Sequence, residues 1–167
     1  VPAKVRTTVV SFPDRHFIAA GSSAYNASDG SSGVFDPMLV RWSTQEDFTK
    51  FAPTALNTAG DQRLEVGTKI ITMVNTREET IISTDEAVYG MTFVGDPFIF
   101  SFRLLGTGVG AIGLNSMIAI DGTTYWMGNR SFYSYDGIVQ EIQCPVKHFI
   151  FERMATRFFD KVIVGHN

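Results

Sequence analysis

Three pairs of neighbouring carboxylates are the residues of this chain whose types and spacing best suit chemistry: Glu46-Asp47, Glu78-Glu79 and Asp85-Glu86. Two carboxylates that converge in one pocket hydrolyse glycosidic bonds, one as the acid and the other as base or nucleophile. Each pair here falls in an expected turn or at an expected helix start, where solvated charges are common. A glycoside hydrolase is therefore kept only as a lesser alternative.

A glycine-rich stretch, GVGAIG at residues 108–113, matches the GxGxxG pattern of dinucleotide-binding loops. In such a site a helix follows the loop, and its N-terminus meets the pyrophosphate. Here residues 114–122 form a short apolar run that ends in Asp-Gly, which is typical of a strand and a turn. We therefore expect a flexible connection between two groups of strands and no bound cofactor.

The remaining metal-binding and nucleophilic side chains are scattered along the chain. His16, His148 and His166 have no paired spacing, so each is expected at the surface or half-buried. Cys144 is the only cysteine, which excludes a disulfide framework, and it is expected to be buried as a small apolar group. Residues 26–30 (NASDG) lack the acidic series of a calcium loop and predict a turn. The sequence assigns no catalytic, cofactor-binding or metal-binding residue.

Five aromatic residues lie close together near the C-terminal end and could stack on sugars or bases: Tyr125, Trp126, Phe132, Tyr133 and Tyr135. Successive residues of a strand point to opposite faces, so either Tyr125 or Trp126 must face the core. The other is free to cover a neighbouring sheet. We interpret these aromatics as core residues first.

The composition predicts one folded, all-β domain. The chain has 167 residues, of which 44% are hydrophobic and 19% charged, and it is rich in Phe and Gly. Its net charge of −3 gives no basic surface for gripping nucleic acid tightly. No apolar run is long enough to span a membrane. The first residues contain neither an initiator methionine nor a signal peptide, so we expect a processed chain or a piece of a longer one.

Two stretches, residues 79–89 and 123–133, repeat one pattern 44 residues apart: an apolar run, a polar turn, and a second apolar run with Tyr at the matching place. Strand-turn-strand units at about 40–45 residues have the period of a β-propeller blade, which contains four strands. The repeat therefore predicts a rigid array of antiparallel blades.

The turn signals divide the whole chain into such units. In the first, strands at 5–11, 15–21 and 38–43 surround a long Ser/Gly loop at 22–35 and a helical turn at 44–50. The predicted layout is a rough blade at 5–66, a blade at 68–105, a blade at 116–142, a short amphipathic helix at 146–160, and the start of a further blade at 161–167. Because a propeller needs at least four blades to close, we expect a partial propeller that is completed by further chain.

Several segments, in this order and spacing, resemble a known family. They are residues 36–43 (DPMLVRWS), 47–48 (DF), 59–67 (AGDQRLEVG), the repeated hairpins, and 160–167 (DKVIVGHN). This pattern resembles the tail nozzle proteins of short-tailed bacteriophages, which are also called tail tubular or stabilization proteins. The resemblance covers about residues 15–167, and the loop at 22–35 departs from it.

The resemblance implies a structural virion protein with no catalytic residues. It implies six copies around the tail axis, between the portal-adaptor region and the tail tip, with neighbouring copies and other tail proteins such as adaptor and fibres as partners. The copies are assembled in the host cytoplasm and let DNA pass without sequence-specific binding. The alternative from another class is a receptor- or glycan-binding propeller at the tail tip.

Overall fold

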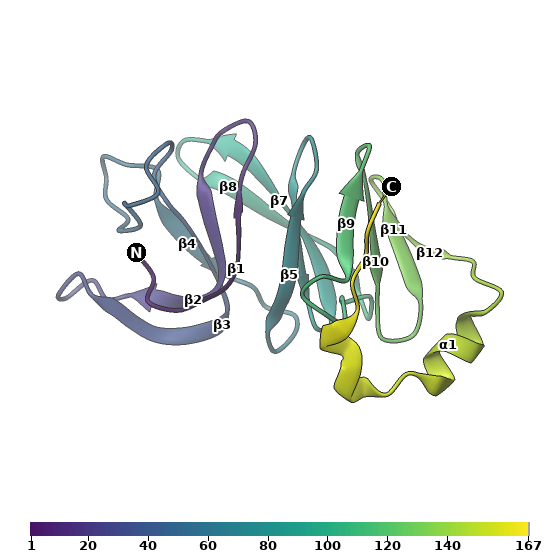
Figure 1. The fold of residues 1–167 in the computed structure, drawn as a ribbon. Coiled ribbons are helices and arrows are strands. Elements are labelled where there is room, and N and C mark those ends of the chain that lie inside the picture. The colour runs from purple at the N-terminus through teal and green to yellow at the C-terminus, as the bar shows by residue number, and fades with distance from the viewer. Residues whose placement is uncertain (167) are drawn as a thin grey trace.

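The computed structural model describes residues 1–166 and contains three four-stranded antiparallel sheets that follow one another along the chain (Figure 1). The first sheet contains β1 (Val5–Val10), β2 (Phe17–Tyr25), β3 (Ser32–Trp42) and β4 (Gly60–Arg63). The second contains β5 (Ile70–Asn75), β6 (Thr80–Thr84), β7 (Ala87–Gly95) and β8 (Ile99–Thr107). The third contains β9 (Met117–Ile120), β10 (Thr123–Met127), β11 (Phe132–Tyr135) and β12 (Val139–Ile142). The expected all-β class and the eight strands expected between residues 68 and 142 are confirmed.

The repeat seen in the sequence is also a repeat of strand register. In the second sheet Ile82 pairs with Tyr89 and Ser83 with Val88. In the third sheet the pairs 44 residues later are Trp126 with Tyr133 and Met127 with Phe132. Because register fixes which face each side chain takes, equivalent residues of the two sheets point the same way.

The sheets pack face to face, and their first strands lie next to one another. β1 contacts β5, and β5 contacts β9. One core lies between the first and second sheets, with Val40 and Trp42 meeting Ile82 and Tyr89. A second core lies between the second and third sheets, where Ile81, Val88, Trp126 and Tyr135 gather. The second sheet is therefore buried on both faces, which explains why β6 is buried at every position.

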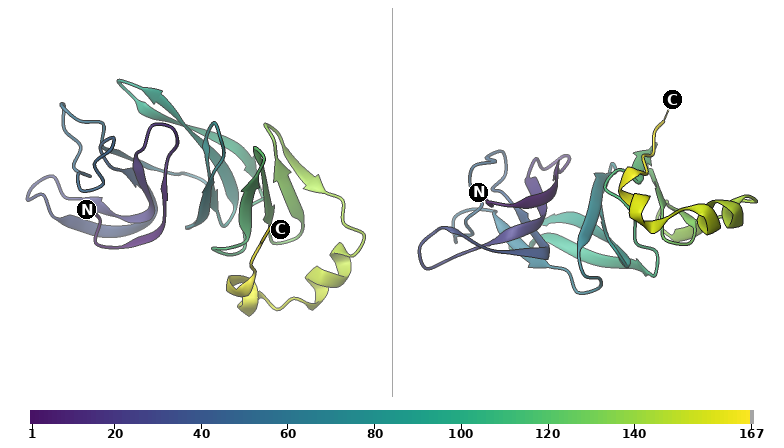
Figure 2. Two further views of the ribbon diagram at one scale, coloured as in Figure 1. Left: turned by 45° about the horizontal axis from the view of Figure 1, so that its top comes forward. Right: turned by 60° about the horizontal axis from the view of Figure 1, so that its bottom comes forward.

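Two short helices and an extended segment follow the third sheet. Helix α1 (Lys147–Arg153) and the 3₁₀ helix η1 (Thr156–Lys161) lie on the side away from the first sheet (Figure 2). After η1, Ile163 forms a parallel bridge with Asn115, and the Val164 N–H donates to the Asn115 carbonyl at 2.9 Å. The chain thus returns beside the start of β9, as β5 lies beside β1. The further blade expected at 161–167 extends to Asn167, which lies outside the described residues.

The expected loop at 22–35 is wrong for most of its length. β2 continues to Tyr25 and β3 begins at Ser32, so only the tip at 26–31 is a turn. Asn26 and Asp29 hold this tip, because their carboxamide and carboxylate oxygens accept from the N–H groups of Ser28 and Ser31. Cross-strand pairing overrides the low strand propensity of Ser, Gly and Asp here.

The helical turn expected at 44–50 is also wrong. The segment is a turn closed by an isolated bridge between Thr44 and Asp47. Asp47 accepts from both the N–H and the hydroxyl of Thr49, an arrangement that favours a turn over a helix.

The single helix expected at 146–160 is instead divided in two. The backbone of Met154 and Ala155 is extended between α1 and η1. Neither helix has a fully buried residue, so the expected apolar face does not pack into a core. Phe149 stays 58% exposed, although Phe151 reaches the ring of Phe132 at 5.5 Å between centroids.

The glycine-rich connection at 108–113 is pinned rather than flexible. The N–H groups of Val109 and Gly110 donate to the Glu86 carbonyl, and Ala111 bridges to Gly128. A Cβ on Gly110 would lie 2.5 Å from the backbone of Thr84, Asp85 and Glu86. The glycine allows close backbone packing between the second and third sheets.

Candidate functional site

A charged cleft of about 400 Å³ lies at the seam between the second and third sheets. Its walls are the β5–β6 turn, β8, and the β9–β10 and β11–β12 turns. It gathers carboxylates and arginines that are far apart in the sequence: Glu78, Glu79, Asp121, Asp136, Arg77 and Arg103. This is the place in the described part of the chain where one of the predicted carboxylate pairs meets other acids.

Glu79 is the least exposed of the charged residues in this cleft, with 12% of its side chain accessible, and it crosses the seam. The hydroxyl of Tyr135 donates to its Oε1 at 2.6 Å, and Arg103 Nη2 donates to that same hydroxyl at 2.9 Å. Arg103 Nη2 also lies 3.5 Å from Glu79 Oε1. The other oxygen, Oε2, is buried against Gly90, where a Cβ would collide with it. Glu79 was expected to be solvated, and this expectation is wrong.

The cleft holds Tyr135 in its neutral form. Burial, followed by the hydrogen bond to Glu79, raises the pKa of Tyr135 to about 12. A phenol with this pKa donates to a carboxylate at neutral pH and is neither a base nor a nucleophile there. Since Glu79 already accepts from Tyr135 and faces Arg103, its Oε1 is occupied as well. These contacts form a hydrogen-bonded tie, by which we mean the link from Glu79 of the second sheet to Tyr135 of the third.

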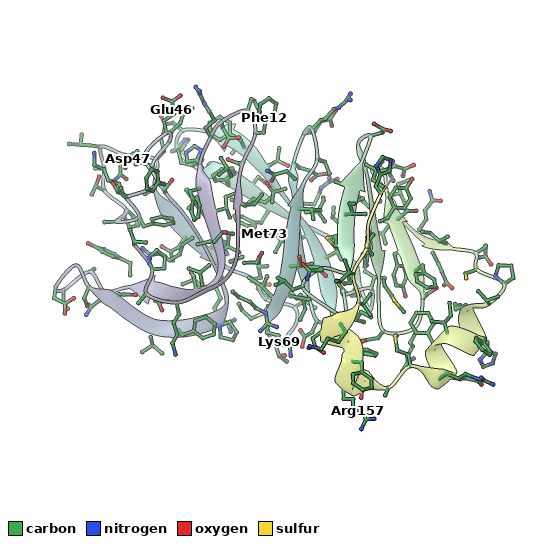
Figure 3. The ribbon with its side chains drawn as sticks, viewed as in Figure 1. Phe12, Glu46, Asp47, Lys69, Met73 and Arg157 are labelled. Carbon is green, nitrogen blue, oxygen red and sulfur yellow. The ribbon has the colours of Figure 1, made fainter. Side chains whose placement is uncertain are left out.

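The other two carboxylate pairs hold local turns. Asp85 accepts from the hydroxyl and the N–H of Thr68, and these bonds outweigh desolvation, so its pKa is lowered. Glu46 and Asp47 are labelled in Figure 3. Glu46 forms an ion pair with Arg15, and Asp47 Oδ2 lies 3.1 Å from Lys50 Nζ. Hydrogen bonds from Thr49 lower the pKa of Asp47 to about 2. These acids stabilise loops, as the sequence indicated.

His16 is fully buried, contrary to the expectation of a surface or half-buried residue. Its Nδ1 lies 2.8 Å from Asp14 Oδ2 and its Nε2 lies 3.0 Å from the Thr58 hydroxyl. Ser11 also donates to Asp14 Oδ2. The ring packs edge-on against Phe100, with centroids 5.1 Å apart.

A hydroxyl, an imidazole and a carboxylate in series are the parts of a nucleophilic triad. Here Thr58 has other partners, because its Oγ1 also accepts from the Gln45 N–H and its carbonyl accepts from Trp42 Nε1. The series joins the β1–β2 turn to the long loop after β3. We therefore interpret it as a buried structural network, which fully satisfied polar groups can form.

The outward face of the third sheet, which carries Tyr125, Phe132 and Ile142, is incompletely covered. Together with Ile163 it lines a mainly apolar groove of about 260 Å³. Tyr125 is 38% exposed and Ile163 75% exposed. The prediction that Tyr125 and Trp126 take opposite faces is confirmed, since Trp126 is 2% exposed and donates its Nε1–H to the Val109 carbonyl at 2.6 Å.

A second groove of about 530 Å³ follows the first strands of the three sheets, and its lining is of mixed polarity. Arg6 and Thr8 of β1, Thr72 of β5, and Asn115 before β9 are its polar side chains, and Met73, Met117 and Ile163 are among its apolar ones.

The remaining sequence candidates are not brought together. Cys144 is partly exposed rather than fully buried, and His148 lies at the surface beside Glu152. Within residues 1–166, no three His, Cys, Asp or Glu side chains gather closely enough to hold a metal ion. The helices in the same range are too short and too polar to cross a membrane.

Sequence reasoning missed Arg41. It is 2% exposed and lies next to the last residue of β3, where its guanidinium donates to the carbonyls of Ser23 and Phe51 at 2.9 and 2.7 Å. A sequence signal for its burial was present. Arg41 lies within the apolar run from Met38 to Trp42, where a solvated charge is unusual. The cross-seam partners of Glu79 gave no such signal.

Comparison of the sequence with protein-family models and with curated proteins finds no match.

Proposed function

We propose that this protein is a structural component of a bacteriophage tail, in which its sheets are blades of a β-propeller that forms part of the nozzle. The role is non-catalytic: the chain supplies a stiff wall that retains the genome and lets it pass. Three packed four-stranded sheets with adjacent first strands support the propeller architecture. The segments that resemble tail nozzle proteins support the assignment to a tail.

One observation carries the propeller proposal: the third sheet repeats the second, but its outward face lacks the cover that the second sheet has. Ile81 and Val88 are completely buried under the third sheet. Their equivalents 44 residues later are Tyr125 and Phe132, and Tyr125 is 38% exposed. A further sheet packed in the same manner would bury them, with the segment at 162–164 as its first strand.

The first sheet offers a different contact. Its outward face is covered by the chain's own residues 44–58, so a sheet that closed the ring would meet this loop rather than β2 and β3. The loop presents Phe48 and Leu56, which are 68% and 99% exposed. We assign this side of the protein to contacts with a neighbouring subunit or tail protein, because exposed apolar groups mark such interfaces.

The charge of the chain is compatible with a conduit. Tight binding of DNA needs a surface of several Lys and Arg side chains that neutralise phosphates. This chain has a net charge of −3, and some of its Arg and Lys residues form ion pairs, such as Arg63 with Asp36 and Lys147 with Glu141. Such a wall attracts DNA weakly and lets it slide.

Labelling of purified particles tests the tail assignment. Antibodies raised against the exposed turn at 26–31 should label the tail of the phage that encodes the chain, with copies arranged around the tail axis in averaged electron micrographs. Antibodies against a buried segment such as 80–84 serve as the control and should not label intact particles. Virions that contain no peptide of this chain by mass spectrometry would overturn the proposal.

A further inference from the structure

Arg41 is a buried cation without an ionic partner. Only 2% of the residue is exposed, and none of the ion pairs among residues 1–166 includes it. Its two hydrogen-bond acceptors are neutral carbonyls, and its Nε is buried with no partner. The rings of Tyr25 and Phe51 lie 5.8 and 5.7 Å from its Cζ.

Such an arrangement is costly unless something compensates the charge. Burial lowers the pKa of Arg41, and the charge of Asp61, which pairs with Arg41 across β3 and β4, opposes part of this effect without forming an ion pair. A guanidinium has five N–H donors, and two donate here, so three are without an acceptor. An anion brought close to Arg41 would gain strong, charge-assisted hydrogen bonds in a site of low dielectric.

A pocket of about 290 Å³ gives access to Arg41. Its walls come from the end of β2, the β2–β3 turn and the loop at 44–58. Lys50, which is also ion-paired with Asp47, adds a second positive charge to the lining, and none of the lining residues is acidic. The other walls carry small hydrogen-bonding groups, namely Ser31, Thr49, Thr54 and Asn57, with the ring of Tyr25 beside them.

These observations point to a ligand that has one carboxylate and several hydroxyl groups. We propose that the pocket beside Arg41 binds an acidic sugar, with the carboxylate directed at Arg41 and Lys50 and the hydroxyl groups at the Ser, Thr and Asn side chains. The aromatic ring of Tyr25 suits the apolar face of a sugar ring. This site is independent of the tail proposal, since it lies on the first sheet and uses none of the residues of the open face.

Titration calorimetry of the folded chain at low salt and pH 7 tests the site, with D-glucuronate, D-glucose and inorganic phosphate as probes. Glucuronate should bind at least about tenfold more tightly than glucose, which lacks the carboxylate. Phosphate should bind more weakly than glucuronate, because it cannot use the hydroxyl-binding walls. Equal binding of glucuronate and glucose, phosphate binding as tight as that of glucuronate, or no binding at all would overturn the proposal.

Variants separate the pocket from general charge attraction. Lys50→Ala should weaken glucuronate binding by about three- to tenfold, since one charge-assisted contact is lost. Lys69→Ala removes the same charge from the start of the second sheet, away from Asp47 and the loop (Figure 3), and should change binding less than about twofold. Arg41→Gln should abolish binding; should this variant fail to fold, the comparison of Lys50 with Lys69 still decides. An equal loss of glucuronate affinity in the Lys50 and Lys69 variants would contradict the proposed binding site.

Discussion

The outward faces of the first and third sheets are covered to very different extents. On the first sheet, the loop at 44–58 places Phe51 against Phe17 and Arg41, and both Phe51 and Arg41 are 2% exposed. On the third sheet, α1 and the C-terminal segment cover part of the surface and leave Tyr125 and Ile163 in solvent. The loop that covers the first face is tied down by hydrogen bonds from Arg41 and Trp42.

The difference shows which of the two outward sheet faces is covered by the chain's own residues and which is open to further packing. Solenoids and other repeat arrays protect a terminal repeat with an atypical element that has a polar outer surface. The loop at 44–58 covers part of the first sheet in this manner, but it differs from such a cap because it exposes Phe48 and Leu56. The third sheet has no comparable cover over Tyr125, and in the proposed propeller its face would be that of an internal repeat. We therefore expect further packing on the third sheet to resemble the two existing seams, and contacts of the first sheet to be made through its loop.

The largest expected effect concerns two neighbouring residues on opposite faces of β10. Trp126→Ala should lower the free energy of unfolding by about 3–5 kcal/mol, because it empties the second core and removes the hydrogen bond to Val109. Tyr125→Ala should cost less than about 1 kcal/mol in the same chain, because its face is open. Urea denaturation measures both. Similar losses for the two variants would mean that the third sheet has no open face.

The stability of the first sheet should depend on Phe51, which lies in the loop that covers its outward face. Phe51→Ala is expected to cost about 3 kcal/mol, at the low end for a buried Phe because a loop can relax into the space. Leu56→Ala in the same loop is the matched control and should change stability by less than about 0.5 kcal/mol, since Leu56 is 99% exposed. Chemical denaturation of both variants checks this. A stable Phe51 variant would show that the loop does not protect the first sheet.

The packing of the second sheet on the third should become less stable at high pH. The pKa of Tyr135 is raised to about 12, whereas that of an unfolded tyrosine is about 10. Its contribution to stability is therefore complete below about pH 10 and is lost as the pH rises toward 12, where the unfolded chain loses its proton first.

Urea midpoints of the wild type and Tyr135→Phe between pH 9 and 11.5 measure this effect. The wild type should lose more stability than the variant over this range, although burial also raises the pKa of Tyr133 in both proteins. Identical pH profiles would show that the tie between Glu79 and Tyr135 does not hold the seam.

The smallest effect on stability is expected for Ile163→Asp. Ile163 is 75% exposed and lies at the groove of the open face, so the change should alter the free energy of unfolding by less than about 0.5 kcal/mol. It should nevertheless reduce binding of an apolar dye and any self-association measured by light scattering, because it places a charge on the open face. Leu56→Asp is the comparison on the opposite side, and it should leave dye binding to the third sheet unchanged.

The hairpins of the second and third sheets could be predicted because their signals are local. Alternating apolar residues define the strands, and Asp-Gly and Gly-Asn turns separate those of the third sheet. The two sheets therefore begin and end within about two residues of the blades predicted at 68–105 and 116–142. The predictions that were wrong concern segments whose structure depends on residues far away in the sequence. The Ser- and Gly-rich residues at 22–35 pair as strands because β2 and β3 lie side by side, and residues 146–160 form no single helix because no core receives their apolar side chains.

The sequence by itself determined the all-β class, the 44-residue repeat and the absence of a disulfide, because hydrophobic periodicity, turn chemistry and residue counts are properties of neighbouring residues. Only the tertiary structure decided that Glu79 meets Tyr135, that His16 is buried against Asp14 and Thr58, and that Arg41 Nε is buried with no hydrogen-bond partner among residues 1–166. These contacts join residues up to 56 positions apart. Their energies come from burial and from the packing of one sheet on another, and no local pattern records which sheet faces will meet.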